Sequence, residues 1–232
     1  MIEENTPNLT YPSKERYHEF TPYVKIYLTI GIVGMVQKSF IDTKLYEIRW
    51  HGRGGQGAIT AAKIIAQAAY LNGYNGVTAA PSFGAERRGA PVSASTRISP
   101  QTVMVMSQVE KPNVVVVLDD TLLKDPDTTS GLNSEGWLVV NSQQYPKELK
   151  CYGDFNIASA DATRVCQELG LIVSGLTVVN TAILGALIRA TEIVDMASLE
   201  KVIRERFSNK TIDINLAAIT KTYEITKLHK MR

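Results

Sequence analysis

A run of glycines between a predicted strand and a predicted helix constrains the fold of this chain most. Residues 45–51 (LYEIRWH) alternate between two faces, which is typical of a strand. Residues 51–57 (HGRGGQG) form a glycine-rich turn directly after it, and residues 57–71 have the composition of a helix. A strand, a glycine turn and a helix in this order predict an α/β domain with the turn at one edge of the sheet.

The turn fits the G-x-G-x-x-G pattern of dinucleotide-binding folds at Gly52, Gly54 and Gly57. Backbone amides in such a turn can approach a phosphate, and the N-terminus of the following helix favours negative charge. A NAD site also needs an acidic residue about 20 positions further along. Residues 72–79 (NGYNGVTA) contain neither Asp nor Glu, and no Gly-Lys-Ser/Thr ending supports a P-loop. Two interpretations stay open: glycines that only permit close packing of strand and helix, and a turn that holds a phosphate-bearing ligand or partner.

Residues 81–91 (PSFGAERRGAP) form a second constellation, in which Arg87 and Arg88 follow Glu86. We expect a long functional loop here, because glycines and prolines bound it. The two arginines can form fork-type hydrogen bonds with a carboxylate or a phosphate. A structural ion pair, in which Glu86 holds one arginine and rigidifies the loop, is the alternative. The sequence leaves both open.

The remaining β-rich segments predict a mixed sheet. Residues 91–98 and 102–109 are separated by Ser-Pro-Gln and predict a β-hairpin. Residues 113–118 (NVVVVL) are typical of a central strand covered on both faces. Further strands are expected around Val77 and at residues 137–141 and 155–159.

The end of the chain is predicted to be helical. Residues 177–190 are almost wholly apolar, so we expect this helix to be buried on more than one side. With the strands, these helices predict a Rossmann-like three-layer α/β fold with a mixed sheet and a β-hairpin. The other helices are expected at residues 161–169, 198–207 and 212–227.

Residues 1–44 are expected to form an N-terminal extension ahead of one domain, residues 45–232. The apolar segment 24–36 is shorter than the roughly 20 residues that a membrane helix needs. The acidic start also lacks the basic region of a signal peptide, so the chain is expected to be cytoplasmic. Met35 is an alternative start of translation.

Composition excludes several classes of site. A net charge of +2 is too small to indicate a nucleic-acid or anionic-membrane partner. The two cysteines, Cys151 and Cys166, cannot hold a four-thiolate iron–sulfur cluster or a structural zinc ion, and we expect both to be buried free thiols. We assign no catalytic and no metal-ligating residue to this chain.

The glycine turn and the arginine loop together carry a resemblance to a known family. The segments HGRGGQGAITAAKIIAQAA and PSFGAERRGAPV resemble the gamma subunit, or gamma domain, of the 2-oxoacid:acceptor oxidoreductases. The resemblance covers residues 46–224, and its Glu-Arg-Arg-Gly-Ala-Pro-Val wording is similar to that of the pyruvate branch. Branched-chain 2-oxoacid enzymes and a stand-alone NAD-dependent oxidoreductase are the alternatives.

The resemblance implies one subunit of a larger enzyme, with alpha, beta and delta subunits as partners. Such a complex decarboxylates a 2-oxoacid on thiamine diphosphate with Mg²⁺, passes electrons through 4Fe–4S clusters to ferredoxin, and transfers the acyl group to coenzyme A (CoA). We expect this chain to act as a scaffold that binds none of these cofactors alone. It would help to hold CoA, with Arg53, Gly54, Gly55, Gln56 and Gly57 facing the ligand and Arg87 or Arg88 assisting.

Overall fold

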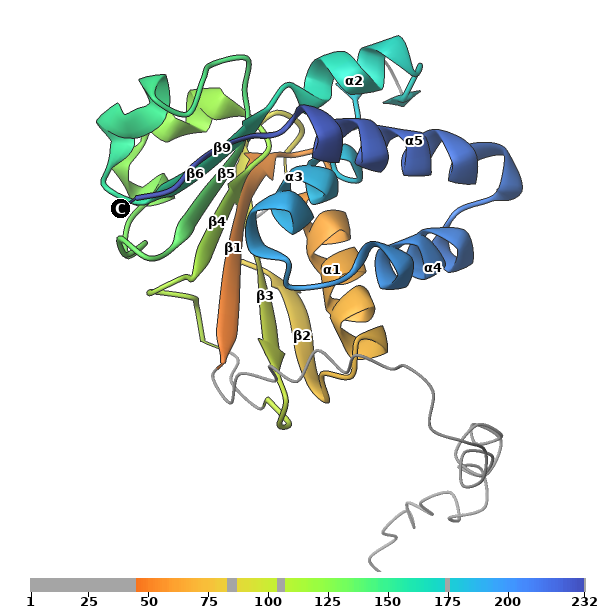
Figure 1. Cartoon of the computed structure of the whole chain (residues 1–232), viewed down its shortest axis with the longest axis horizontal. Coiled ribbons are helices and arrows are strands. Elements are labelled where there is room, and N and C mark those ends of the chain that lie inside the picture. The colour runs from red at the N-terminus through yellow and green to blue at the C-terminus, as the bar shows by residue number, and fades with distance from the viewer. Residues whose placement is uncertain (1–44, 83–86, 104–106, 174–175, 232) are drawn as a thin grey trace, which may run out of the picture. The chain divides into compact units, whose positions relative to one another are not determined.

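The computed structural model describes residues 45–82, 87–103, 107–173 and 176–231. The predicted extension, residues 1–44, lies outside the described residues, and its separation from the domain 45–232 stays a prediction. The described chain forms a seven-stranded mixed sheet in the order β2-β3-β1-β4-β5-β6-β9, shown in Figure 1. Its strands are β1 (Tyr46–Arg53), β2 (Gly76–Pro81), β3 (Pro91–Ser99), β4 (Val114–Val117), β5 (Trp137–Asn141), β6 (Asn156–Ala160) and β9 (Lys227–His229).

Helices cover the sheet, and three short 3₁₀ helices follow β4 and β5. The α-helices are α1 (Ala58–Leu71), α2 (Ala162–Glu168), α3 (Ala182–Thr191), α4 (Met196–Arg206) and α5 (Asn209–Ile225). The 3₁₀ helices are η2 (Asp120–Lys124), η3 (Pro126–Thr128) and η4 (Glu148–Tyr152). A separate antiparallel pair is formed by β7 (Ile172–Val173) and β8 (Leu176–Thr177).

The central part of the sheet is parallel. Strand β1 pairs with β4, β4 with β5, and β5 with β6, all in the same direction. All four residues of β4 are completely buried. The prediction of a central strand covered on both faces is therefore confirmed.

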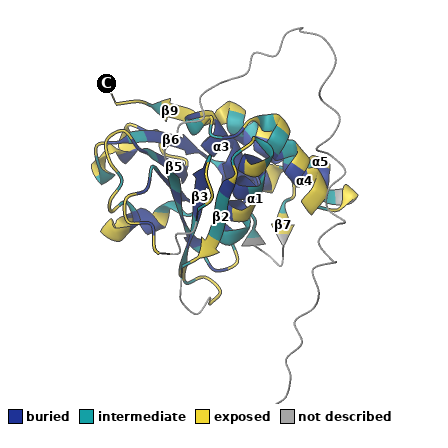
Figure 2. Ribbon diagram, turned by 90° about the horizontal axis from the view of Figure 1, so that it is seen from below, coloured by how far each residue is buried: buried dark blue, intermediate teal, exposed yellow. Residues whose placement is uncertain are grey.

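The two faces of the sheet are covered differently. Figure 1 shows α1, α3, α4 and α5 gathered on one side, where they enclose the larger hydrophobic core around Ile48 and Trp50. A smaller core on the other face joins β4, β5 and β6 to the 3₁₀ helices through residues such as Val115 and Leu138. Figure 2 shows the buried residues between these layers. The predicted three-layer α/β fold is confirmed.

The predicted hairpin is formed by different partners. Strand β3 pairs antiparallel with β1 on one side and with β2 on the other, so the hairpin is β2–β3. The prediction of a strand at residues 102–109 is wrong for residues 102–103 and 107–109, while residues 104–106 lie outside the described residues. Two arginines of the sheet hold the later part of this segment instead: Arg97 Nη2 donates to the Ser107 carbonyl (2.6 Å) and Arg49 Nη1 to the Val109 carbonyl (3.2 Å).

The predicted apolar helix begins later than expected but is buried as predicted. Residues 176–177 form β8, and α3 begins at Ala182, with residues 182–188 all buried. A Cβ atom on Gly185 would lie 2.1 Å from the Ile219 carbonyl oxygen of α5. The glycine therefore lets α3 and α5 pack backbone to backbone.

The C-terminal segment differs from its prediction. Helix α5 ends at Ile225, and residues 227–229 form strand β9, which pairs antiparallel with β6. Of the two cysteines expected to be buried, Cys151 is exposed, so that prediction is wrong for this residue. Cys166 is buried, and burial raises the pKa of its thiol to about 12. Within the part of the chain that the structure describes, none of the helices has the length and apolar character that crossing a membrane requires.

Candidate functional site

The glycine turn is closed by hydrogen bonds of its own residues. The Arg53 backbone N–H donates to Gln56 Oε1 (2.7 Å), and the Gln56 backbone N–H donates to the Arg53 carbonyl (2.9 Å). Gly57 caps α1 with a left-handed backbone (φ 82°), without a side-chain cap and without an acidic residue in the first helical turn. The first amides of α1 are thus not neutralised by a carboxylate, which is a favourable arrangement for an anion.

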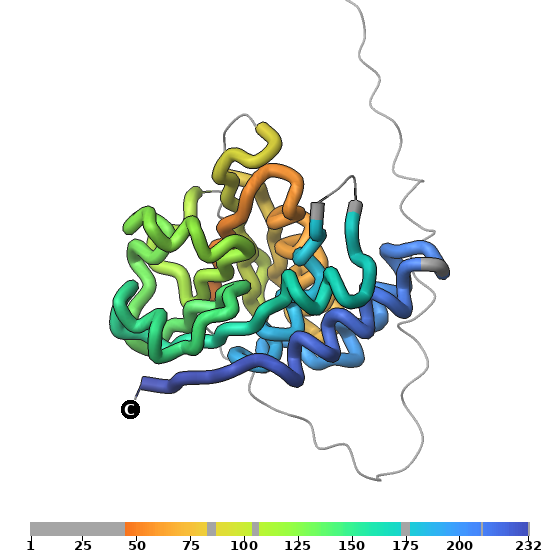
Figure 3. Tube along the Cα trace, turned by 90° about the horizontal axis from the view of Figure 1, so that it is seen from above, coloured from red at the N-terminus to blue at the C-terminus, as the bar shows by residue number. Residues whose placement is uncertain are grey.

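The arginine loop is docked directly on this turn. The Gly54 N–H donates to the Ala90 carbonyl (2.8 Å), and the Gly89 N–H donates to the Gly54 carbonyl (3.0 Å). A Cβ atom on Gly54 would lie 2.2 Å from the Arg87 carbonyl oxygen, so only glycine permits this approach. Figure 3 shows the end of β1 and the loop side by side. The structure therefore brings together the two motifs that the sequence singles out.

Arg53 joins three segments at this edge. Its Nε donates to Asp119 Oδ2 (2.8 Å), its Nη2 to Thr121 Oγ1 (2.8 Å) and its Nη1 to the Gly89 carbonyl (3.2 Å). Burial raises the pKa of Asp119, but hydrogen bonds from Thr121 and Arg53 outweigh this and lower it overall. The Asp119 carboxylate is therefore ionised at neutral pH, and most of the hydrogen-bonding capacity of Arg53 is used within the protein.

Arg87 and Arg88 are exposed at the surface of the same loop. Glu86, the alternative ion-pair partner for one arginine, lies outside the described residues. Among the described residues, no hydrogen bond or ion pair involves the Arg87 side chain. Its guanidinium is therefore available to an external anion.

A polar crevice of about 470 Å³ lies beside the turn, at the carboxyl ends of β4, β5 and β6. Its lining carries three carboxylates, and none of the described residues that form it is basic. The crevice thus disfavours a phosphate, in contrast to the side of the turn that bears Arg87 and Arg88. Its polar lining residues are Gln56, Asp119, Asp120, Asn141, Ser142, Gln143, Gln144, Asp161 and Thr163.

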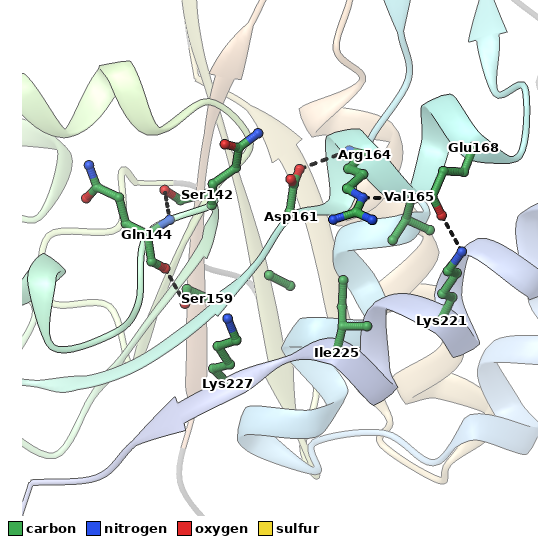
Figure 4. Close-up of a pocket in the computed structure, with 12 residues that line it drawn as sticks. Ser142, Gln144, Ser159, Asp161, Arg164, Val165, Glu168, Lys221, Ile225 and Lys227 are labelled. Atoms are coloured by element: carbon green, nitrogen blue, oxygen red, sulfur yellow. Dashed lines mark hydrogen bonds and ion pairs between the residues drawn. The ribbon is translucent and has the colours of Figure 1, made fainter.

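A second cavity of about 470 Å³ adjoins this crevice between α2, α5 and β9 (Figure 4). Lys221 forms an ion pair with Glu168, which also pairs with Arg164 (2.8 Å). The Lys227 ammonium lies 3.5 Å from the centroid of the Tyr145 ring. The lining carries Arg164, Lys221 and Lys227 against the carboxylates of Asp161 and Glu168, so most of its positive charge is compensated.

Metal-ligating side chains do not gather within residues 45–82, 87–103, 107–173 and 176–231. No group of three or more His, Cys, Asp or Glu side chains suited to a metal ion is found there. The site therefore consists of a backbone turn, a docked loop and two exposed arginines.

Comparison with known proteins identifies the family of this chain. Residues 47–225 match the family "Pyruvate ferredoxin/flavodoxin oxidoreductase". The chain belongs to this family. Within the pyruvate ferredoxin/flavodoxin oxidoreductase family, the chain is 44% identical over 191 residues to the "Pyruvate/ketoisovalerate oxidoreductases common subunit gamma" of Pyrococcus furiosus, covering 81% of this chain and 100% of the relative.

A relative and a crystal structure from Thermotoga maritima, both from the same family, agree with this assignment. The chain is 43% identical over 193 residues to "Pyruvate synthase subunit PorC", covering 81% of this chain and 97% of the relative. The crystal structure of the pyruvate oxidoreductase subunit PORC superposes with a TM-score of 0.70 at 38% identity, covering 81% of this chain and 99% of that one. The family resemblance stated from the sequence is confirmed.

Asp119 and Thr121 were not predicted from the sequence as parts of this site. A signal was present, because the residues Asp119-Asp120-Thr121 begin two positions after the end of the buried β4 and so fall at the same sheet edge as the glycine turn. The structure leaves the predicted ligand contacts of residues 53–57, 87 and 88 as a hypothesis.

Proposed function

We propose that this chain is the gamma subunit of a cytoplasmic pyruvate:ferredoxin oxidoreductase (pyruvate synthase). The complex would convert pyruvate and CoA to acetyl-CoA, CO₂ and reduced ferredoxin. The observation that carries the proposal is the 44% identity to a gamma subunit whose whole length the chain covers.

The division of labour follows from the residues of this chain. Among the described residues no side-chain cluster suits a metal ion, and the whole sequence has two cysteines. Alpha, beta and delta subunits would therefore hold thiamine diphosphate, Mg²⁺ and the 4Fe–4S clusters. This chain would supply a scaffold and part of the CoA site.

We propose that a phosphate of CoA binds on the arginine side of the glycine turn. The uncapped N-terminus of α1 and the free guanidinium of Arg87 favour an anion there. The carboxylates of Asp119 and Asp120 disfavour it in the crevice beside the turn. Arg53 would contribute mainly by holding the turn, because Asp119, Thr121 and Gly89 already engage its guanidinium.

A branched-chain 2-oxoacid enzyme is the second candidate. One observation favours it: the relative from Pyrococcus furiosus is named as a subunit common to pyruvate and ketoisovalerate oxidoreductases. A gamma subunit that serves two enzymes cannot by itself select between their substrates. The choice of 2-oxoacid would then lie with the companion subunits.

The decisive experiment is purification of the chain from its source with its companions, followed by ferredoxin or viologen reduction with several 2-oxoacids side by side. A brown complex of four chains that is most active with pyruvate supports the proposal. Greater activity with 2-oxoisovalerate supports the second candidate. A colourless homodimer that reduces NAD, or an isolated chain that turns over pyruvate, contradicts both.

A further inference from the structure

A cavity of about 380 Å³ lies beside β1, β2 and β3 and takes no part in the proposed function. Its described lining also includes the segment 107–109 and Asp127 of η3. The polar residues that line it alongside Arg49 are His51, Ser82, Ser93, Ser95, Ser107, Gln108 and Asp127.

Arg49 cannot offer its charge to a ligand in this cavity. Its Nη2 donates to the carbonyls of Ser130 (2.6 Å) and Thr128 (3.1 Å), in addition to the contact of Nη1 with Val109. The nearby Asp127 carboxylate compensates the charge of the guanidinium. An incoming anion would have to compete with these carbonyls and with Asp127.

Arg49 also determines which nitrogen of His51 carries the proton. Arg49 Nε donates to His51 Nε2 (3.1 Å), so a neutral imidazole must carry its hydrogen on Nδ1. Burial and the charge of Arg49 lower the pKa of His51 to about 4, against a smaller opposite effect of Asp125, which keeps the ring neutral. Among the described residues nothing accepts a hydrogen bond from Nδ1. In this part of the chain, Thr222 Oγ1 is the one completely buried side-chain polar atom that lacks a partner. Because His51 Nδ1 also lacks a partner, it cannot be completely buried and is accessible to solvent.

The serines of β3 stand directly opposite these two residues. Ser93 pairs in register with His51, and Ser95 with Arg49. The hydroxyls of Ser82, Ser93 and Ser95 and the amide of Gln108 form no side-chain hydrogen bond to any described residue. The cavity therefore combines unused neutral donors and acceptors with charges that are already compensated.

We propose that this cavity binds an uncharged, amide-bearing small molecule, with His51 Nδ1–H donating to the amide oxygen and the β3 serines contacting its polar atoms. A neutral group can satisfy these side chains without bringing an unpaired charge into a partly buried site. The volume falls within the range of small-molecule pockets. The inference does not depend on the proposed function.

The test uses the full chain and three probes of nearly equal shape: N-acetylglycinamide (neutral), N-acetylglycine (anionic) and N-acetylethylenediamine (cationic). Imidazole ¹⁵N shifts of His51 are followed by NMR at pH 7 during titration. The free protein is expected to show the Nδ1–H tautomer. The neutral probe is expected to shift the Nδ1 resonance saturably, and each charged probe to bind about tenfold more weakly.

Two variants locate the binding. Ser93→Val and Ser95→Val remove hydroxyls but suit a strand, and each is expected to weaken the neutral probe at least about threefold. Ser134→Val, at an exposed serine that does not line the cavity, should leave binding unchanged. The proposal is overturned if no probe shifts His51 saturably, if a charged probe binds as tightly as the neutral one, or if both β3 variants bind normally.

Discussion

Arg53 Nε lies 2.8 Å from Asp119 Oδ2 and so ties the end of β1 to the end of β4, across 66 positions of sequence. The sequence predicts Arg53 as a ligand contact, whereas in the structure its side chain stabilises the site by joining two segments of the protein. Both side chains are partly exposed, at 34% and 20%, so solvent screens their attraction.

A double-mutant cycle with Arg53→Gln and Asp119→Asn should give a coupling free energy of unfolding of about 1 kcal/mol at pH 7, measured by urea denaturation. The folded pKa of Asp119 is lowered from the ordinary value of 3.8. The stabilisation is therefore present above pH 3.8 and is lost as the pH falls through the folded pKa. A coupling that is the same well below the folded pKa as at pH 7 would show that the ion pair does not cause it.

Arg87→Gln in the assembled complex should raise the Michaelis constant for CoA about tenfold, which corresponds to the loss of one charge-assisted hydrogen bond. Decarboxylation of the 2-oxoacid in the absence of CoA should be unchanged. Steady-state and single-turnover kinetics measure the two effects separately. Lys63→Gln, at an exposed position of α1, is the matched control and should change neither. An unchanged Michaelis constant in Arg87→Gln would leave the chain with an assembly role.

Gly54→Ala should destabilise the protein by about 3 kcal/mol or more and separate the arginine loop from the glycine turn. The added Cβ would meet the Arg87 carbonyl oxygen at 2.2 Å, and a backbone atom cannot move aside like a side chain. Gly73→Ala is the control: φ is +96° there, and no atom lies within 4 Å, so about 1–2 kcal/mol of backbone strain is expected. Thermal unfolding of both variants measures the loss of stability. An equal loss in Gly54→Ala and Gly73→Ala would contradict the close approach at Gly54.

His51 should make stability fall in mild acid. Its folded pKa of about 4 lies below the unfolded value of 6.5, so between these values the unfolded chain binds more protons. Stability should therefore decrease as the pH falls from about 6.5 to 4, by up to about 3 kcal/mol. Urea denaturation at several pH values measures the slope, and His51→Gln should flatten it. A wild-type slope that persists in the variant would assign the effect to other groups.

The strand–turn–helix unit was predictable because its signals are local. The alternation in β1, the glycines of the turn and the alanines of α1 each act within a few residues. Asp161 accepts from the Arg164 backbone N–H (2.9 Å) at the start of α2, and Gly170 adopts φ 72° just beyond its end, so both ends of this predicted helix are also fixed locally.

The partners of β3 could not be read from the sequence. Residues 102–109 have strand composition, yet β3 already has β1 and β2 on its two sides, and both arrangements satisfy the same periodicity. Strand β9, at three residues, is too short to show a period. The arginine loop docks on Gly54 through backbone contacts between residues far apart in the sequence. The sequence shows a glycine at position 54, but it does not show which segment packs against it.

The position of β3 between β1 and β2 has a consequence for nucleotide recognition. In dinucleotide folds the acidic residue that binds the ribose hydroxyls follows the second strand, adjacent to the first. Here the end of β2 is displaced by one inserted strand, to about 10 Å from the end of β1. In dinucleotide folds, a ribose near the glycine turn lies beside a carboxylate. In this chain, a ribose at the same position would lie beside the loop that carries Arg87 and Arg88. This exchange of an anionic neighbour for cationic ones suits a phosphorylated ribose, such as that of CoA, better than the free hydroxyls of NAD.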